Sequence, residues 1–334
     1  MNKIRLHQKI FLASNSTDTL GFSLLSNGFE LNKCVQSPNY RLFQIPKKTG
    51  GYRQIMEPNM PLKTMQKNLS TLLQNLLEVP KSVHGFVKTT KGLPKHIKSN
   101  ASQHVGKKWV YNIDIQNFFG SINATQVQQR FKQKPFEFSE EKSRYLTLLV
   151  VFNKQLPAGA PSSPIISNMV CEAMDQEFCK WAQAQNELEP TAQWCYTRYA
   201  DDLTFSCNEA ILPMHQIEIN DLLQQYGFER KVEKDRLFSH LQGQWVTGIK
   251  VNVKPNVDRR FIRNLRAILH NSRKHGLEIS ANRYLYHTET MLASEEDISR
   301  FLCMLKGKID HIGFVRGKED SIYLNLKTQW QHLQ

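Results

Sequence analysis

The 334-residue sequence lacks several features that would assign it to a common class of protein. Its six cysteines form no CxxC pair, so the sequence indicates neither a zinc site nor a disulfide framework. We expect reduced cysteines in the core of a cytoplasmic protein. No apolar run is long enough to cross a bilayer, and we recognise no signal peptide, internal repeat or low-complexity linker. A membrane partner is therefore not expected.

Acidic residues are also absent between Glu78 and Asp114, a segment that contains seven lysines. The whole chain has 44 Lys+Arg against 30 Asp+Glu, which gives a net charge of +14 and a pI near 9.5. This balance favours a polyanionic partner, although a merely basic soluble protein would fit it too. The lysines could belong to a solvated loop. We interpret the segment as a surface that follows a nucleic-acid backbone, with Lys88 and Lys91 as candidate contacts.

Two adjacent carboxylates lie at the tip of a predicted β-hairpin. The runs 194–199 and 203–206 are β-prone, and Ala200, Asp201 and Asp202 separate them. Neighbouring carboxylates repel each other, so an ordinary turn gains nothing from them. Mg²⁺ prefers oxygen ligands and would make use of both.

A third carboxylate, Asp114, lies near the end of the apolar, β-prone run 109–115. Alone it could be an isolated aspartate that ends a strand. In a two-metal site the ions are roughly 3.5–4 Å apart and activate the attacking and leaving oxygens. If the two strands are neighbours, Asp114 and Asp201 can bridge both ions. The sequence therefore predicts a site for two Mg²⁺ ions with Asp114, Asp201 and Asp202 as catalytic residues.

Five ordered motifs give the chain a resemblance to bacterial retron reverse transcriptases. Two of the motifs look specific to retron enzymes, namely the NAxxH motif at 100–104 and the VTG motif at 246–248. The other three are the Asp114 block, the loop 159–164 and the Tyr-Ala-Asp-Asp motif at 199–202.

The resemblance implies an α+β right-hand polymerase. Its interleaved fingers and palm would place an antiparallel palm sheet against helices, followed by a mainly helical C-terminal thumb. We expect an N-terminal extension at 1–40, fingers and palm at 41–255, and the thumb at 256–334. Within these segments the sequence predicts a hairpin at 45–55, helices capped by Asn123, Ser139 and Ser294, and a helix end at Gly313.

The resemblance also implies a nucleotide site. Lys48 and Arg53 would meet the triphosphate of the incoming dNTP, although both could be ordinary surface residues. Phe119 would exclude a ribose 2′-OH, although Phe118 or Phe119 could simply be packed core. Further implied contacts are Ala158, where relatives usually have Gln, together with Gly159, Lys234 near the leaving pyrophosphate, and Ile115 as an additional metal ligand. Lys234 could instead be a solvent-exposed lysine, and its surroundings differ from the family pattern at Lys231 and Asp235.

The remaining implied contacts are with RNA or DNA. A basic helix face in the thumb segment would meet phosphates while its apolar face packs. The candidates are Asn100, His104, Val246, Thr247, Gly248, Arg259, Arg263 and Arg266.

As a function, the resemblance implies copying of a cognate structured non-coding RNA, which serves as template and primer, into single-stranded DNA. The product would be a branched RNA–DNA molecule (msDNA) made in the cytoplasm of a bacterium, within a phage-defence system that has a separate effector protein. Two alternatives stay open: a reverse transcriptase of the group II intron or diversity-generating class, and a non-catalytic RNA-binding scaffold on a polymerase fold.

Overall fold

The computed structural model describes residues 3–47, 50–89, 94–286 and 293–333, with side chains from Leu6 onward. The chain divides into two compact units. The first comprises residues up to 96 together with 111–236, and the second comprises 97–110 together with 237–334. This division differs from the expected segments, because 97–110 and 237–255 group with the C-terminal helices.

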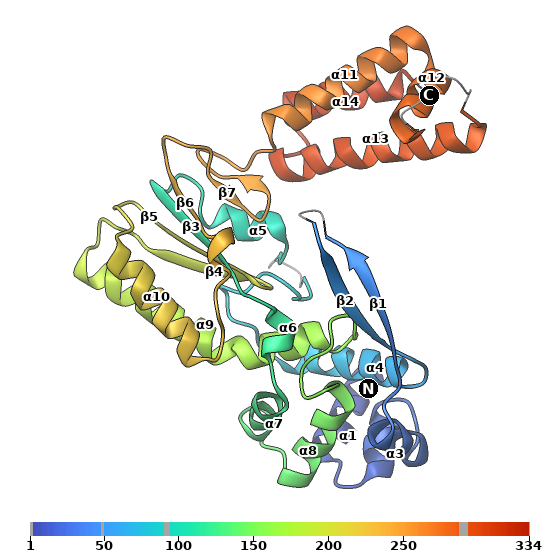
Figure 1. The fold of residues 1–334 in the computed structure, drawn as a ribbon, viewed down its shortest axis with the longest axis vertical. Helices are drawn as coiled ribbons and strands as arrows, with labels where there is room; N and C mark the ends of the chain where they lie inside the picture. The colour runs from blue at the N-terminus through green and yellow to red at the C-terminus, as the bar shows by residue number, and fades with distance from the viewer. Residues whose placement is uncertain (1–2, 48–49, 90–93, 287–292, 334) are drawn as a thin grey trace. The chain divides into compact units, whose positions relative to one another are not determined.

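Antiparallel pairing organises the first unit. A long hairpin joins β1 (Tyr40–Pro46) to β2 (Tyr52–Pro58), with Phe43 opposite Ile55 (Figure 1). Glycines at positions 50 and 51 have φ of 86° and 75°, the left-handed values that its turn requires. A four-stranded sheet has the order β4-β5-β3-β6, and β4 and β5 are antiparallel. Its strands are β3 (Trp109–Asp114), β4 (Cys195–Tyr199), β5 (Asp202–Cys207) and β6 (Arg236–Ser239), of which residues 109–110 and 237–239 are counted with the second unit.

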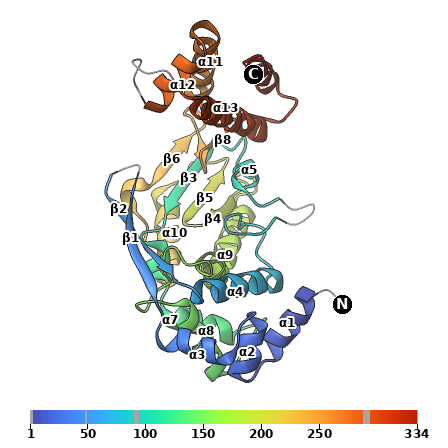
Figure 2. The ribbon, with the colours of Figure 1, turned by 90° about the vertical axis from the view of Figure 1, so that its right-hand side faces the viewer.

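Helices pack around these strands. Figure 2 shows α4 with α1–α3, α7 and α8 gathered around it, while α9 packs against β4 and against α10. The helix bounds are α1 (Lys3–Ala13), α2 (Thr17–Ser23), α3 (Gly28–Gln36), α4 (Leu62–Leu76), α6 (Phe118–Ser121), α7 (Ala124–Lys132), α8 (Glu140–Val150), α9 (Ser163–Leu188), α10 (Pro213–Gln225) and the 3₁₀ helix η1 (Val232–Lys234).

Helix α9 is the central support of the sheet. It starts directly after the Pro/Gly-rich loop, with Pro164 in its first turn, where a missing N–H costs nothing. Ile166, Met169 and Phe178 are at most 2% exposed. The Phe178 ring lies 5.0 Å from Tyr196 and 5.2 Å from Phe205 between ring centroids, so the helix is packed directly onto both strands of the β4–β5 hairpin.

The second unit has its own core. Four helices pack on one another, and α5 contacts the short strands β7 and β8. Helix α11 is amphipathic, because Ile262, Leu265 and Leu269 are buried while the arginines between them are exposed. The bounds are α5 (Ile97–Ser102), β7 (Trp245–Val246), β8 (Ile249–Lys250), α11 (Arg259–His275), α12 (Leu277–Tyr286), α13 (Glu295–Arg316) and α14 (Ser321–Gln331).

The structure confirms the expected α+β class, the hairpins and the three helix caps, since Asn123, Ser139 and Ser294 each accept a hydrogen bond from the third residue of their helix. The predicted helix end at Gly313 was wrong. Helix α13 continues to Arg316, so Gly313 lies inside it. The Tyr323 ring occupies the space that a side chain at position 313 would need, which explains the glycine.

The expectation that all cysteines are buried was wrong for two of them, since Cys179 and Cys303 are exposed. All six are free. Among the described helices, none combines the length and apolar character needed to cross a membrane.

Candidate active site

The Asp201–Asp202 pair lies where β4 turns into β5. Tyr199 pairs with Asp202 across this tight hairpin, and Ala200 has a left-handed φ of 59°. A non-glycine residue in this conformation is uncommon and must be held by its surroundings. The strained turn brings both carboxylates to one end of the sheet.

Asp114 reaches the same place from β3, the strand next to β5 in the sheet. The amide of Ile115 donates a hydrogen bond to the carbonyl of Asp201, with an N···O distance of 3.0 Å. The strand end that carries Asp114 is therefore tied directly to the carboxylate turn. The side chain of Ile115 is buried, so only its main chain could contribute to a metal site.

The three carboxylates act on one another electrostatically. Desolvation is the largest cause that raises the pKa of Asp202, and the negative charges of Asp201 and Asp114 add to it. Desolvation also raises the pKa of Asp201, with a further contribution from Asp114. Among the residues that the structure describes, no three His, Cys, Asp or Glu side chains converge as a ready-made metal cluster. What the structure shows is a set of crowded oxygen donors whose repulsion a divalent cation would relieve.

Lys234 is part of this site. Its Nζ lies 2.6 Å from Oδ2 of Asp114 and partly neutralises that carboxylate. The loop that carries Lys234 is fixed to the strand, because the amide of Lys231 donates to the carbonyl of Asp114 and the amide of Gln116 donates to that of Glu229, each at 2.8 Å.

A second interaction holds the same loop and explains one departure from the family pattern. Arg230 Nη1 donates to Oδ2 of Asp235 at 2.9 Å and to the hydroxyl of Tyr111 at 2.8 Å. The Tyr111 hydroxyl in turn donates to Oδ2 of Asp235 at 3.1 Å. Asp235, where relatives usually have Thr, thus forms an ion pair with Arg230 that Tyr111 bridges, next to Lys234. We call these three residues the Arg230–Asp235 clip.

Two of the expected nucleotide contacts are linked to the carboxylates: Lys234 pairs with Asp114, and Arg53 acts on Asp201 through its charge. The charge of exposed Arg53 acts to lower the pKa of Asp201, so this residue lies within electrostatic range of the site. Phe118 is buried, whereas Phe119 is half-buried with its ring centroid 5.9 Å from that of Phe86. Lys48 lies outside the described residues.

The loop before α9 packs against the long hairpin. The amide of Met56 in β2 donates to the carbonyl of Ala158 at 2.7 Å. A side chain on Gly159 would come within 2.7 Å of Ile55, so only glycine fits this close approach. Main-chain contacts therefore hold Ala158 in place, and its short side chain is half-buried.

The two motifs that look specific to retrons lie side by side in the second unit. The hydroxyl of Thr247 donates to the carbonyl of Ile97 at the start of α5, and α5 packs against β7 and β8. Asn100, His104 and Val246 are at most 1% exposed, so direct contact with RNA is not open to them in this structure. Thr247 and Gly248 are accessible at the turn.

The other predicted nucleic-acid contacts are on the surface. Lys88 is exposed in the first unit, and Arg259, Arg263 and Arg266 are exposed on α11. Lys91 lies outside the described residues.

A buried polar network, which the sequence pattern did not reveal, lies behind the Asp201–Asp202 turn. Arg198, Asp175 and Asn168 are at most 4% exposed and contact one another. The available signal was a charged residue, Arg198, inside an otherwise apolar strand next to the Tyr-Ala-Asp-Asp motif.

Comparison with known proteins agrees with this geometry. Residues 45–288 match the family described as "Reverse transcriptase (RNA-dependent DNA polymerase)". The retron Mx65 reverse transcriptase of Myxococcus xanthus is 29% identical over 76% of this chain and 60% of that protein. The retron Ec83 reverse transcriptase of Escherichia coli is 29% identical over 66% of this chain and 70% of that protein.

Among solved structures, apo telomerase from Candida tropicalis aligns with a TM-score of 0.47 and 14% identity over 87% of this chain and 61% of that chain. The chain spans about 60% of the length of the Myxococcus relative. The family match covers well over half of the chain, and the curated relatives confirm the resemblance inferred from the motifs. The chain belongs to the reverse transcriptase (RNA-dependent DNA polymerase) family, and its relatives within that family include retron enzymes.

Proposed function

We propose that this protein is an RNA-directed DNA polymerase that adds deoxynucleotides to a primer on an RNA template. The observation that carries the proposal is that Asp114, Asp201 and Asp202 lie at the ends of neighbouring strands and interact electrostatically, with Lys234 paired to Asp114. A scaffold without catalytic activity would have no need for three mutually repelling carboxylates.

The donor set fits Mg²⁺. Asp114, Asp201 and Asp202 would hold two ions, with the main chain of Ile115 as a further donor. When bound, the ions lower the pKa of the primer hydroxyl and stabilise the leaving pyrophosphate. Burial is the largest cause that raises the pKa values of Asp201 and Asp202, and the charge of neighbouring carboxylates adds to it. This supports the assignment, because carboxylates that repel each other gain from a shared cation.

The other residues of the site position the nucleotide. Arg53 is suited to the triphosphate because its planar fork can bind phosphate oxygens in pairs. Phe119 would lie under the sugar and exclude a 2′-OH. Lys234 is placed to neutralise or protonate the pyrophosphate as it leaves, since it already lies beside Asp114. Ala158 and Gly159 allow close approach of the nascent base pair.

Each unit carries exposed basic residues that would contact nucleic acid. Exposed Lys88 and the Arg259, Arg263 and Arg266 face of α11 would contact phosphates. In the second unit, Thr247 and Gly248 would contact the primer or the RNA. The buried residues Asn100, His104 and Val246 would support the turn between β7 and β8.

The retron relatives extend the proposal to a natural substrate. The template and primer would be one structured non-coding RNA, and the product a branched msDNA. A separate effector protein would complete a phage-defence system in the bacterial cytoplasm.

Sequencing of the RNA and DNA that co-purify with the protein tests this function. We expect the wild type to carry one small RNA joined to one short DNA, and Asp201→Asn to carry the RNA without the DNA. Equal RNA in both, with no DNA in either, would contradict the proposal and favour the scaffold.

A further inference from the structure

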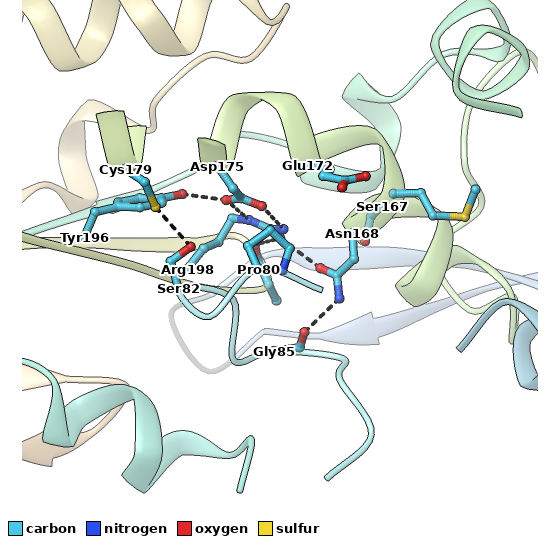
Figure 3. Close-up of polar contacts among 12 residues, drawn as sticks. Pro80, Ser82, Gly85, Ser167, Asn168, Glu172, Asp175, Cys179, Tyr196 and Arg198 are labelled. Atoms are coloured by element: carbon cyan, nitrogen blue, oxygen red, sulfur yellow. Dashed lines mark hydrogen bonds and ion pairs between the residues drawn. The ribbon is translucent and has the colours of Figure 1, made fainter. Parts of the chain in front are cut away.

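A fully buried arginine lies directly behind the catalytic turn. Arg198 in β4 is 0% exposed, and its guanidinium faces Asp175 and Asn168 on α9 (Figure 3). Nε donates to Oδ1 of Asp175 at 2.8 Å, and Nη2 donates to Oδ2 of the same carboxylate at 2.7 Å. This two-point pair compensates the buried charge, so the arginine carries little net field toward the catalytic carboxylates.

The remaining guanidinium nitrogen reaches the turn itself. Nη1 donates to the carbonyl of Ala200 and to Oδ1 of Asn168, each at 3.1 Å. Ala200 is the left-handed residue immediately before Asp201. The bond to its carbonyl therefore restrains the peptide that carries the first carboxylate of the pair.

A third segment closes the network from the other side. The side-chain Nδ2 of Asn168 donates to the carbonyl of Gly85 at 3.0 Å. A Cβ on Gly85 would lie 2.3 Å from the amide nitrogen of Ala200, so this backbone abuts the turn. The main chain of Arg198 bonds to Ser82 and His84 as well, with N···O distances of 2.9 and 2.8 Å. Helix α9, strand β4 and the segment 82–85 thus all meet at the strained residue.

We propose that Arg198, oriented by Asp175 and Asn168, is a positioning residue that holds the Ala200 turn in the conformation that presents Asp201 and Asp202 to the metal ions. The inference rests on the proposed polymerase function, because the carboxylates are what it positions. Its physical basis is the planar guanidinium. Nη1 donates to Ala200 and Asn168 at once, while Nε and Nη2 donate to Asp175. Lysine has no such planar group and cannot make all of these bonds together.

The alternative is a purely structural ion pair, and the chain provides a matched control. Arg130 on α7 is also buried, and it pairs with Glu172 on α9, the helix that carries Asp175. It donates to the carbonyls of Met169 and Lys134 at 2.9 and 2.7 Å. Neither carbonyl belongs to the catalytic turn. Arg130→Lys therefore disturbs another pair between a buried arginine and a carboxylate of α9, here the half-buried Glu172, without touching Ala200.

The test compares Arg198→Lys, Asn168→Ala and Arg130→Lys by amide hydrogen exchange and by single-nucleotide addition. In the first two variants we expect exchange in residues 199–203 to be roughly tenfold faster than in the wild type. The kcat should fall roughly ten- to a hundredfold with little change in KM for the dNTP, because misplaced groups slow chemistry more than binding. Arg130→Lys should leave both quantities unchanged even if its melting temperature falls.

The exchange measurement decides the inference independently of activity. Wild-type exchange at the turn in Asn168→Ala and in folded Arg198→Lys would overturn it, as would equal acceleration in Arg130→Lys. If Arg198→Lys fails to fold, Asn168→Ala gives the answer. An inactive wild type would count against the proposed function alone, because the exchange comparison could still be read.

Discussion

Nζ of Lys234 lies 2.6 Å from Oδ2 of Asp114, although the two residues are 120 positions apart in the chain. The pair joins a carboxylate from β3 to a lysine from η1, and it makes Lys234 a component of the site. Hydrogen bonds on both sides of the pair, from Lys231 to Asp114 and from Gln116 to Glu229, fix the distance between the two segments.

Lys234→Met should slow nucleotide addition without abolishing nucleic-acid binding. We expect kcat to fall roughly a hundredfold, the range for loss of a positioned acid or charge at a leaving group. Single-turnover extension measures the effect. The matched control is Lys231→Ala, which keeps the amide bond to Asp114 and should retain activity within a few fold. Comparable losses in the two variants would show that Lys234 acts only through the loop.

Asp235→Thr restores the residue usual in relatives but should destabilise this protein. Arg230 and Tyr111 would lose a shared carboxylate in a half-buried position, at a cost of about 1–3 kcal/mol. Urea unfolding measures the difference in the free energy of unfolding. Tyr111→Phe, which removes one hydroxyl, should cost less, about 1 kcal/mol. A stability equal to that of the wild type in Asp235→Thr would contradict the clip.

Phe119→Ala should weaken discrimination against ribonucleotides. The half-exposed ring would no longer exclude a 2′-OH, so the ratio of dNTP to rNTP incorporation should fall by roughly tenfold or more. Competition between the two substrates on one template measures it. Phe118→Ala is the contrasting variant. Loss of its buried ring should lower the free energy of unfolding by about 3–5 kcal/mol instead. An unchanged ratio in Phe119→Ala would rule out that Phe119 excludes the 2′-OH.

Replacement of Arg259, Arg263 and Arg266 by Ala should lower the affinity for nucleic acid. It should also make that affinity less sensitive to salt concentration. If each meets one phosphate, the slope of log K against log[salt] should become shallower by about 2–3. A matched triple variant replaces three exposed basic residues of α13 and α14, namely Arg300, Lys306 and Lys327. The exposed face of α11 is not a phosphate contact if both triple variants change the slope equally.

The sequence predicted the parts of the site that depend on local pattern. The strand 109–115 and the hairpin around Asp201 follow from β-prone runs and a tight turn, and Asn123 and Ser139 follow from cap chemistry. Asp114 was predicted from its place near the end of an apolar strand, whereas the role of Arg53 came from the resemblance and stays a prediction.

Tertiary packing determined what the sequence did not show. Asp175 lies in the middle of a helix and pairs with Arg198 on a strand 23 residues away, and periodicity cannot reveal such a pair. The same holds for Gly313, where the Tyr323 ring rather than a helix end explains the glycine. Burial of Asn100 and His104 was equally invisible, since polar residues are usually exposed.

Extension of a labelled primer on a defined RNA template, with dNTPs and Mg²⁺, tests the central claim most directly. The wild type should add deoxynucleotides, and Asp201→Asn should lose roughly a thousandfold in rate through the loss of a metal ligand. Asp221→Asn, an exposed aspartate on α10, should match the wild type. An Asp201→Asn protein that extends the primer as fast as the wild type would contradict the account.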